Sequence, residues 1–430
     1  MLSAVRKILL KTWKAAQPYL LTPRRWTALL LRRFLRRTTF IAITGSNGKT
    51  TATRYLAAIL SSHAPTQWTR MNRNGQSGIT ETIAFCNPWK TRFAVFEVGF
   101  GTPGSIKRAV RIIQPHIAIV LSVFLEHRGV LKSLHNVARE KADLLTNLPP
   151  DGIAVLNADD PHVAIMPVPA GRKVIRFGAS ADCDARYENA TSAWPDLLRF
   201  TAVVNGQRQE IRTRLLGLHW AGPMLACIAV AHHLGVSLEQ SARVIATVPP
   251  YPARMQVVRL PSGAIVIRDE FKGARHTTAV AFEELRKAKA ARKFLVYCDE
   301  SESSRGFRVR LARIGRWAAE LVDYALFIGD KSGHAVRGAR EAGLAEQHAL
   351  AFKDYAAAAA FLKPILGPGD VVLLKASRNN QLSRVLFSLL GEVRCTIPVC
   401  DRTMVCDDCA EFRNHDLVQM VNEQLTVGAD

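Results

Sequence analysis

The chain has 430 residues, of which 48% are hydrophobic and 22% are charged. At roughly 100–200 residues per domain, this length predicts about two to four domains. The composition excludes a disordered chain, a collagen-like repeat and a membrane protein with many spans. The charge is unusual, because 58 Lys and Arg residues against 36 Asp and Glu residues give a net charge of +22. This excess of positive charge favours anionic partners.

Residues 1–39 form a basic segment, which we predict to be two short helices broken around Pro18 and Pro23. The first 40 positions contain no acidic residue and hold ten basic ones: Arg6, Lys7, Lys11, Lys14, Arg24, Arg25, Arg32, Arg33, Arg36 and Arg37. In helical geometry the apolar residues gather on one face, with basic residues opposite: Leu2, Val5, Leu9 and Trp13, then Trp26, Leu30 and Phe34. This pattern predicts helices that lie on an anionic membrane surface. The alternative is that the apolar face packs on the following domain or on a partner subunit.

No stretch approaches the roughly 18 uninterrupted apolar residues of a membrane span, and the N-terminus lacks a signal-peptide core. We therefore expect a cytoplasmic protein, peripheral at the inner membrane surface if the basic segment binds lipid. The eight cysteines of a long cytoplasmic chain argue against a disulfide framework.

Short apolar runs alternate with helix-like segments between residues 40 and 157. The apolar runs predicted as strands are 40–43, 93–98, 117–123 and 154–156. Three helices are predicted between them, one that starts at Thr50 and two over 104–113 and 134–145. Continuous apolar strands between helices indicate a parallel sheet covered on both faces. We therefore predict an α/β fold whose central domain spans residues 40–250.

The remaining chain contains a second, smaller α/β pattern. Residues 173–215 resemble short β segments, 222–247 return to helix, and Pro249-Pro250-Tyr251-Pro252 is a candidate linker. Further strands are predicted over 264–268, 294–297, 324–328 and 371–374. These features predict a C-terminal domain over 251–392, followed by a cysteine-rich tail over 393–430.

A glycine-rich loop follows the first predicted strand and reads Thr44-Gly45-Ser46-Asn47-Gly48-Lys49-Thr50-Thr51. Between a buried strand and a helix, such a loop directs backbone N–H groups and the helix N-terminus at phosphate oxygens. Lys49 would reach the β- and γ-phosphates, and the Thr50 hydroxyl would bind Mg²⁺. The general P-loop pattern requires a glycine where this chain has Ile43, so that match fails by one residue. The alternative is a Gly-Asn turn beside an exposed lysine, which the flanking strand and helix make the weaker interpretation.

The loop resembles the shortened T-G-[ST]-N-G-K-T-T form of the Mur ligase family, which are ATP-dependent amide ligases. Further segments are similar to family motifs in the same order: Asn72–Gly78, Glu97-Val98-Gly99, Glu126-His127, Lys141, Asn157–Asp160 and Lys375–Arg378. Residues 72–78 resemble the member that adds D-alanyl-D-alanine to UDP-N-acetylmuramoyl tripeptide. The resemblance spans about residues 40–390 and implies a P-loop central domain and a Rossmann-like C-terminal domain. Only the basic segment precedes the P-loop, so we expect the N-terminal UDP-binding domain to be missing and a UDP-linked substrate to be unnecessary.

The resemblance also implies roles for individual residues. The predicted nucleotide-binding residues are Gly45, Ser46, Asn47, Gly48, Lys49, Thr50 and Thr51, with Arg254 on an ATP phosphate and Asp269 on the ribose. Thr50 and Glu97 would hold one Mg²⁺ ion, and His127 with a carbamylated Lys141 would hold a second. Lys49, His127 and Lys141 are the predicted catalytic residues. Asn74, Lys375 and Arg378 are the predicted substrate contacts.

These roles predict a carboxylate–amine ligase that uses ATP to form an acyl phosphate and then an amide bond, releasing ADP and phosphate. Its partners would be a small-molecule or peptide carboxylate and an amino acid or peptide amine. The alternative within enzymes is a poly-amino-acid synthetase of the poly-γ-glutamate or cyanophycin type. A nucleic-acid-binding NTPase ranks far behind, because the basic residues lack interleaved aromatic residues and any nucleic-acid-reading motif.

Two family motifs differ in this chain. Residues Gly217–Pro223 lack both asparagines of the family's G-x-H-N-x-x-N, which leaves adenine recognition open, with Trp220 as a base-stacking or a core residue. The segment after Asp269 also departs from the family pattern.

Four late cysteines, Cys395, Cys400, Cys406 and Cys409, have the spacing C-x4-C-x5-C-x2-C. Four thiolates suit a Zn²⁺ site or an iron–sulfur cluster, and His415 could replace one ligand. Scattered reduced thiols are an equally good interpretation.

Overall fold

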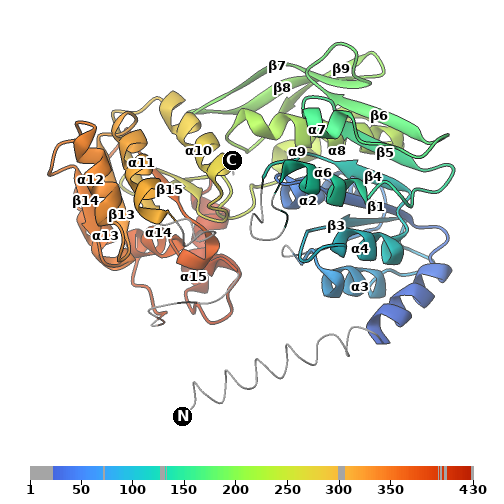
Figure 1. Cartoon of the computed structure of the whole chain (residues 1–430), viewed down its shortest axis with the longest axis horizontal. Helices are drawn as coiled ribbons and strands as arrows, with labels where there is room; N and C mark the ends of the chain where they lie inside the picture. The colour runs from blue at the N-terminus through green and yellow to red at the C-terminus, as the bar shows by residue number, and fades with distance from the viewer. Residues whose placement is uncertain are drawn as a thin grey trace. The chain divides into compact units, whose positions relative to one another are not determined.

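The computed structural model describes residues 23–70, 73–125, 131, 133–298, 306–395, 397, 400 and 404–427 (Figure 1). Contacts along the chain divide it into two compact units. The first unit comprises residues 1–188, 201–211 and 221–245, and the second comprises 189–200, 212–220 and 246–430. The domain boundaries proposed from the sequence, at residues 40, 251 and 393, stay predictions.

The larger sheet contains nine strands within the described residues, in the order β2-β3-β1-β4-β5-β6-β7-β8-β9. Their bounds are β1 (Thr39–Thr44), β2 (Thr66–Trp68), β3 (Phe93–Glu97), β4 (Ile117–Val120), β5 (Ile153–Asn157), β6 (Lys173–Gly178), β7 (Ala185–Ala193), β8 (Asp196–Val204) and β9 (Gln207–Arg212). Strands β1 to β6 pair in parallel. Strand β1 is central, since Ile41 lies opposite Val95 on β3 and Ile117 on β4. The predicted parallel sheet is confirmed.

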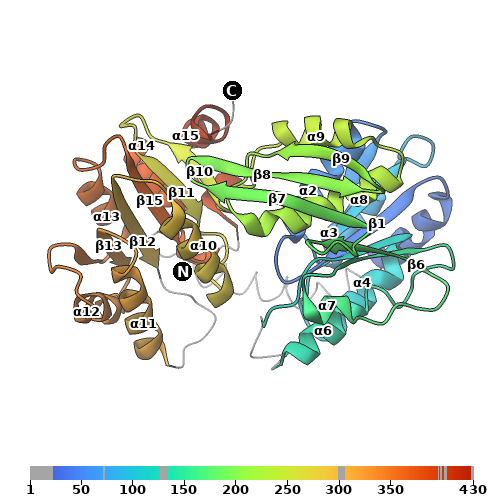
Figure 2. The same ribbon diagram turned by 90° about the horizontal axis from the view of Figure 1, so that it is seen from above.

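Helices cover both faces of this parallel sheet (Figure 2). Their bounds are α2 (Lys49–Ser61), α3 (Gln76–Ala84), α4 (Ser105–Ile113), α6 (Leu134–Ala142), α7 (Pro161–Ala164), α8 (Ala221–His233) and α9 (Leu238–Thr247). Successive β1 side chains point to opposite faces. Phe40 and Ala42 therefore join the core beneath α3, α4 and α6, whereas Ile41 and Ile43 are buried on the other face, where α2 and α8 pack together.

The smaller sheet has six strands within the described residues, in the order β10-β11-β15-β12-β13-β14. Their bounds are β10 (Gln256–Arg259), β11 (Ile265–Asp269), β12 (Arg292–Cys298), β13 (Tyr324–Ile328), β14 (Ala349–Phe352) and β15 (Asp370–Lys375). All neighbours pair in parallel except the β10–β11 hairpin. This sheet belongs to the second unit and confirms the predicted second α/β domain.

The helices of the second unit also lie on two faces of their sheet (Figure 1). They are α10 (Arg275–Lys287), α11 (Phe307–Ala319), α12 (Gly333–Glu341), α13 (Tyr355–Leu362), α14 (Ser383–Leu390) and α15 (His415–Gln419). Strand β12 shows the division, because Leu295 and Tyr297 join the core with α10 to α12, and Phe294 and Val296 join the core with α13 to α15.

Two local features differ from the sequence prediction. The helical region 222–247 is two helices, because the chain leaves α8 through Gly235, whose φ of +92° favours glycine. The basic segment contains a helix over residues 23–34, while residues 1–22 lie outside the described residues. Within the described residues, no helix is both long and apolar enough to cross a membrane.

Candidate active site

The glycine-rich loop joins β1 to α2 as predicted. Gly45 has a φ of +157° and Gly48, which precedes α2, has a φ of +83°. A Cβ atom on Gly45 would lie 2.9 Å from Leu121 Cβ, so the loop has no room for a larger residue there. The first turn of α2 has no acidic residue and no side-chain cap. A helix N-terminus of this kind attracts anionic groups such as phosphates.

Hydrogen bonds fix the loop against the segment that follows β4. The Ser46 and Asn47 backbone N–H groups donate to the carbonyl and hydroxyl oxygens of Ser122, at 2.8 and 3.1 Å. The Ser46 hydroxyl accepts from the Phe124 N–H at 2.8 Å and lies 3.1 Å from the Phe124 carbonyl. Ser46 and Asn47 therefore shape the loop, and in this structure Ser122 accepts both of their backbone N–H groups. The predicted contact of these two residues with a nucleotide stays a prediction.

Two residues of the Asn157–Asp160 motif hold the same segment, Asn157 from the end of β5 and Asp160 from the N-cap of α7. Asn157 donates to the Leu121 carbonyl at 2.8 Å, and Asp160 accepts from the Val123 N–H at 2.7 Å. Sequence analysis gave these residues no role, although their motif was the signal that could have found one.

The Lys49 ammonium lies over the loop. It donates to the carbonyl oxygens of Gly45 and Ser46, the latter at 3.4 Å. Thr50 and Thr51 follow it as buried residues of the first turn of α2. The predicted phosphate-binding residues thus lie together at one helix N-terminus.

Glu97 ends β3 beside the loop, since it lies opposite Ile43 in the β1–β3 register. Its side chain is 1% exposed, and Oε1 accepts from Asn74 Nδ2 at 2.8 Å. The other oxygen, Oε2, is buried without a hydrogen-bond partner among the described residues. An unpartnered buried carboxylate oxygen is costly, and a hard cation such as Mg²⁺ would satisfy it.

Asn74 is packed tightly against the turn after Glu97. A Cβ atom on Gly99 would lie 2.6 Å from Asn74 Cγ, and the Gly99 N–H donates to the Asn74 carbonyl at 3.1 Å. Asn74 therefore orients Glu97, and its predicted substrate contact stays a prediction.

The second predicted magnesium site is only partly described. Lys141 lies on α6 and is 2% exposed, an unusual place for a lysine side chain. Its predicted partner His127, with Glu126, lies outside the described residues. Carbamylation of Lys141 stays a prediction.

In the second unit, Asp269 and Lys375 meet at the ends of β11 and β15. Lys375 Nζ lies 2.6 Å from Asp269 Oδ2 and also donates to the Lys272 carbonyl at 2.6 Å. Burial raises the pKa of Asp269 to about 6, while the charges of Lys375 and Arg254 act in the opposite direction. Lys375 is completely buried, so in this structure it positions Asp269, and it could touch a substrate only after leaving this pair.

Arg254 and Arg378 share one aromatic ring that sequence analysis did not single out. The Arg254 and Arg378 guanidinium carbons lie 4.0 and 5.6 Å from the centre of the Phe271 ring. Ala253 and Met255, with φ of 60° and 50°, bend the backbone on both sides of Arg254. The Arg378 N–H donates to the Phe271 carbonyl at 3.1 Å. Two cations over one ring form a surface suited to a phosphate or carboxylate.

The four late cysteines line one cavity of about 10 Å³ together with Arg384. Arg384 Nη2 lies 3.1 Å from Cys395 Sγ, and the Cys406 thiol lies 3.1 Å from Gln381 Oε1. Burial raises the pKa of Cys406 to about 12, which keeps it a thiol. Within the described residues no cysteine forms a disulfide bond, and no three His, Cys, Asp or Glu side chains are grouped so as to hold a metal. The structure therefore gives no support to the predicted zinc site.

Known families match most of the chain. Residues 43–231 match the Mur ligase middle domain, and residues 253–378 match the Mur ligase glutamate ligase domain. The chain belongs to the Mur ligase family. It is therefore an ATP-dependent ligase that forms amide bonds. This confirms the main functional prediction and does not support the poly-amino-acid alternative.

Relatives of this Mur ligase include two enzymes named UDP-N-acetylmuramoyl-tripeptide–D-alanyl-D-alanine ligase. The one from Mycobacterium tuberculosis is 29% identical over 385 residues, which cover 83% of this chain and 74% of the relative. The one from Escherichia coli is 28% identical over 362 residues, which cover 83% and 77%. The predicted nearness to this member of the family is confirmed.

Solved structures agree with this fold. MurF from Acinetobacter baumannii has a TM-score of 0.78 at 25% identity, over 86% of this chain and 80% of that one. MurF ligase from Thermotoga maritima in complex with ADP has a TM-score of 0.71 at 22% identity, over 84% and 82%, which shows the shared fold.

Proposed function

We propose that this Mur ligase joins the carboxyl group of a peptide precursor to the amino group of an amino acid or short peptide. The buried, unpartnered Oε2 of Glu97 beside the P-loop is the observation that carries the proposal, because it puts an unsatisfied negative group where ATP phosphates would bind through a cation. The names of the relatives make UDP-N-acetylmuramoyl tripeptide and D-alanyl-D-alanine the first pair to test.

The reaction has two balanced steps. A carboxylate oxygen attacks the γ-phosphorus of ATP, the bond to the bridging oxygen breaks, and ADP leaves. The amine nitrogen then attacks the acyl carbon, phosphate leaves with the former carboxylate oxygen, and the ammonium nitrogen loses its protons to solvent or a base. Lys49 and the N-terminus of α2 would stabilise the charge of the transferring phosphoryl group. Arg254 would contact an ATP phosphate, and Asp269 would contact the ribose.

We propose Mg²⁺ as the cation of this site. Thr50 and Glu97 would hold one ion, and their oxygen donors fit a hard cation. His127 and a carbamylated Lys141 would hold a second, since carbamylation turns an amine into an oxygen ligand. Bound magnesium would neutralise the approaching phosphate and carboxylate charges.

As a separate proposal, the cysteine cavity binds one zinc ion per chain through Cys395, Cys400, Cys406 and Cys409. Metal analysis of protein purified without chelator tests it. About one zinc per chain, lost in a Cys406→Ser, Cys409→Ser variant, would support the site, and metal-free protein would end the proposal.

The substrates are found by measuring phosphate release from ATP across a panel of carboxylates and amines, with mass spectrometry of the products. We expect one pair to stimulate phosphate release and to give an amide. The proposed function would be contradicted if no pair increased the rate of phosphate release from ATP.

As a separate proposal, the reaction takes place at an anionic membrane surface. That proposal rests on the N-terminal helix and not on this site.

A further inference from the structure

The helix over residues 23–34 is fixed to the first unit by one face. Ala28 and the following Leu35 are 2% and 1% exposed and belong to the core beneath α3 and α4. Arg32 also faces the unit, where Nε donates to the Ile113 carbonyl at 2.9 Å and the guanidinium lies 3.9 Å from the centre of the Phe40 ring. Sequence analysis placed Arg32 among the lipid-facing cations, whereas the structure uses it as an anchor.

The opposite face of this helix is apolar and exposed. Trp26, Leu30 and Phe34 are 69%, 55% and 64% exposed. They recur every four residues, so they form one stripe along successive turns. The face that packs on the first unit is a different one, so the stripe does not serve that packing. A partner subunit stays the alternative to a membrane. A contiguous exposed apolar surface marks a site of interaction.

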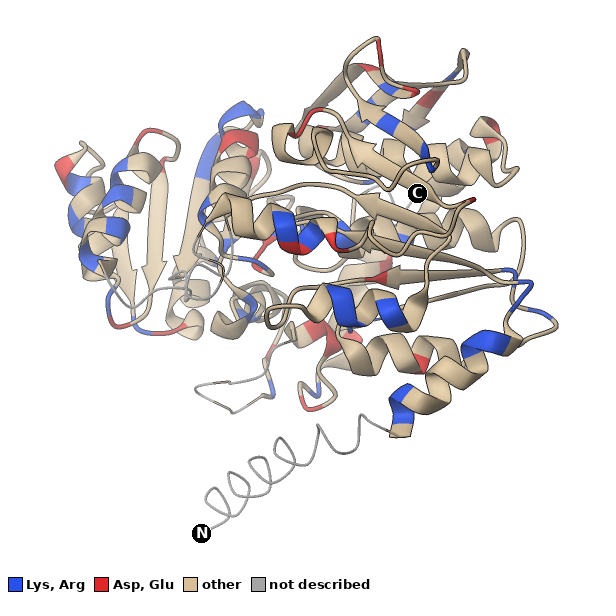
Figure 3. Cartoon of the chain, turned by 45° about the vertical axis from the view of Figure 1, so that its right-hand side comes forward, with Lys and Arg blue, Asp and Glu red and all other residues tan. Residues whose placement is uncertain are grey.

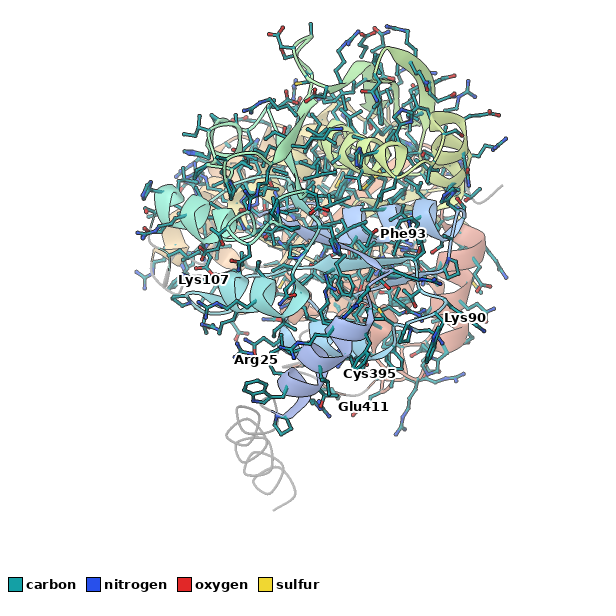
Figure 4. All side chains as sticks on the ribbon, turned by 90° about the vertical axis from the view of Figure 1, so that its right-hand side faces the viewer. Arg25, Lys90, Phe93, Lys107, Cys395 and Glu411 are labelled. Carbon is teal, nitrogen blue, oxygen red and sulfur yellow. The ribbon has the colours of Figure 1, made fainter. Side chains whose placement is uncertain are left out.

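Arginines surround the apolar stripe. Arg24, Arg25, Arg33, Arg36 and Arg37 lie in or next to the helix and have no ion pair within the described residues. The sequence contains no acidic residue before Glu81. The helix accordingly carries Lys/Arg colour and no Asp/Glu colour in Figure 3, and Arg25 is labelled on it in Figure 4. We refer to these five residues as the flanking arginines.

We propose that the apolar stripe inserts into the headgroup region of an anionic bilayer while the flanking arginines contact lipid phosphates. Apolar residues flanked by unpaired cations complement an anionic lipid surface, whose headgroups are negative and whose interior is apolar. Tryptophan is favoured at that depth because its ring is apolar and its N–H is polar. The sequence before the helix continues the pattern, with Leu9 and Trp13 among four basic residues and no acidic one.

Anchoring on the unit gives this surface a fixed orientation. Because Arg32 and Leu35 hold the helix on the first unit, lipid bound to the apolar stripe would dock that whole unit. A membrane-bound ligase would suit a carboxylate or amine substrate that is carried on lipid or destined for the cell envelope.

The test is co-sedimentation of the full chain with vesicles of phosphatidylcholine mixed with phosphatidylglycerol. We compare it with Trp26→Ser, Leu30→Ser, Phe34→Ser combined in one variant. A matched control, Phe85→Ser with Trp89→Ser, removes two aromatic side chains of the first unit that are 67% and 83% exposed but lie outside the helix. Thermal unfolding and phosphate release are measured on all three proteins.

We expect the parent and the control to bind at low salt, the stripe variant to bind at least about tenfold more weakly, and salt to weaken binding. Phosphate release should be equal in the three, which separates a failure of this inference from a failure of the proposed ligase. The inference is overturned if the parent stays in the supernatant, or if the stripe variant binds as the parent does. It is also overturned if light scattering shows a dimer that the stripe variant loses while no protein binds vesicles, since the stripe would then join two copies.

Discussion

At the scale of single residues, the proposed site depends on two side chains of opposite charge. The Lys49 ammonium would bind ATP phosphate, and the Glu97 carboxylate would bind Mg²⁺. Lys49 lies over the P-loop, bonded to loop carbonyls that a nucleotide would replace as its partner. Glu97 presents one oxygen to Asn74 and keeps the other buried without a partner in the described part of the chain. The two residue types are those that phosphoryl transfer requires.

We predict that Lys49→Ala lowers the rate of phosphate release by at least about a hundredfold, because loss of a preorganised charge in the transition state costs several kcal/mol. The circular dichroism spectrum and melting temperature should be unchanged within a few degrees. Lys90→Ala, on an exposed turn of the same unit, is the matched control and should keep full activity. Substrate-dependent release at the parent rate in Lys49→Ala would remove the P-loop assignment.

Lys141 gives a second prediction at this scale. Since a carbamylated lysine supplies oxygen ligands that alanine lacks, Lys141→Ala should be nearly inactive, and added acetate should restore part of the rate. The control is Lys107→Ala, an exposed lysine on the neighbouring α4. Mass spectrometry under native conditions, with and without bicarbonate, checks the modification directly. Full activity of Lys141→Ala would contradict the two-metal arrangement.

Phe271 is the residue that the structure adds to the site. Phe271→Leu removes the ring beneath Arg254 and Arg378, and at about 0.5–1 kcal/mol for each cation–π contact we expect kcat/KM for ATP to fall about tenfold. Phe271→Tyr keeps a ring and should recover most of this loss. Phe282→Leu is the control, because Phe282 is also buried but contacts the Trp317 ring edge-on.

A purely structural role would affect Phe271→Leu and Phe282→Leu alike. We expect both variants to lose stability in urea unfolding, and only Phe271→Leu to change KM. Equal KM values in the two variants would contradict a positioning role for Phe271.

At the scale of elements, the strands and the loop between β1 and α2 could be predicted because local pattern determines them. Continuous apolar runs can form only buried strands or helices, and glycines at Gly45 and Gly48 mark a tight turn. Contacts between distant segments were beyond such reasoning. The local sequence pattern does not show that Asp160 accepts a hydrogen bond from the segment after β4, or that Lys375 is paired with Asp269. It also does not show that the Arg32 side chain binds the first unit.

The C-terminal segment provides a prediction at this scale. Asp407 forms a buried ion pair with Arg268 at 2.7 Å, and both side chains are at most 1% exposed. Arg268 also pairs with the buried Glu270 at 2.8 Å, so Asp407→Asn leaves the guanidinium with one of its two carboxylate partners. Because hydrogen bonds to a buried charged group are weakened, the substitution should cost about 1.5–3 kcal/mol of unfolding free energy. Asp416→Asn, on the exposed side of the same segment, should change it by less than about 0.5 kcal/mol.

Urea unfolding followed by the fluorescence of the second unit measures both effects. An Asp407→Asn variant with the same unfolding free energy as the parent protein would contradict this prediction. It would show that the ion pair of Asp407 with Arg268 on β11 does not stabilise the C-terminal segment.

At the scale of the whole molecule, the order of the motifs along the chain predicted the family. Each motif alone had an ordinary structural explanation, but no such explanation accounts for all of them in the family's order. Composition predicted little of this beyond a folded chain and the preference for anions, and the α/β class came from the alternation of apolar runs with helical segments. The substrates were not predictable, since recognition of a carboxylate and an amine depends on side chains that several segments bring together. The same is true of adenine, for which Gly217–Pro223 lacks the family's asparagines.

The central claim, that ATP activates a carboxylate for amide formation, is tested most directly by isotope transfer. A substrate pair that stimulates phosphate release is supplied with oxygen-18 in its carboxyl group, and the released phosphate is analysed by mass spectrometry. The account predicts that one labelled oxygen per turnover moves to phosphate and that the product is the amide of the pair. Unlabelled phosphate, released by water from ATP at the same rate with or without the amine, would contradict it.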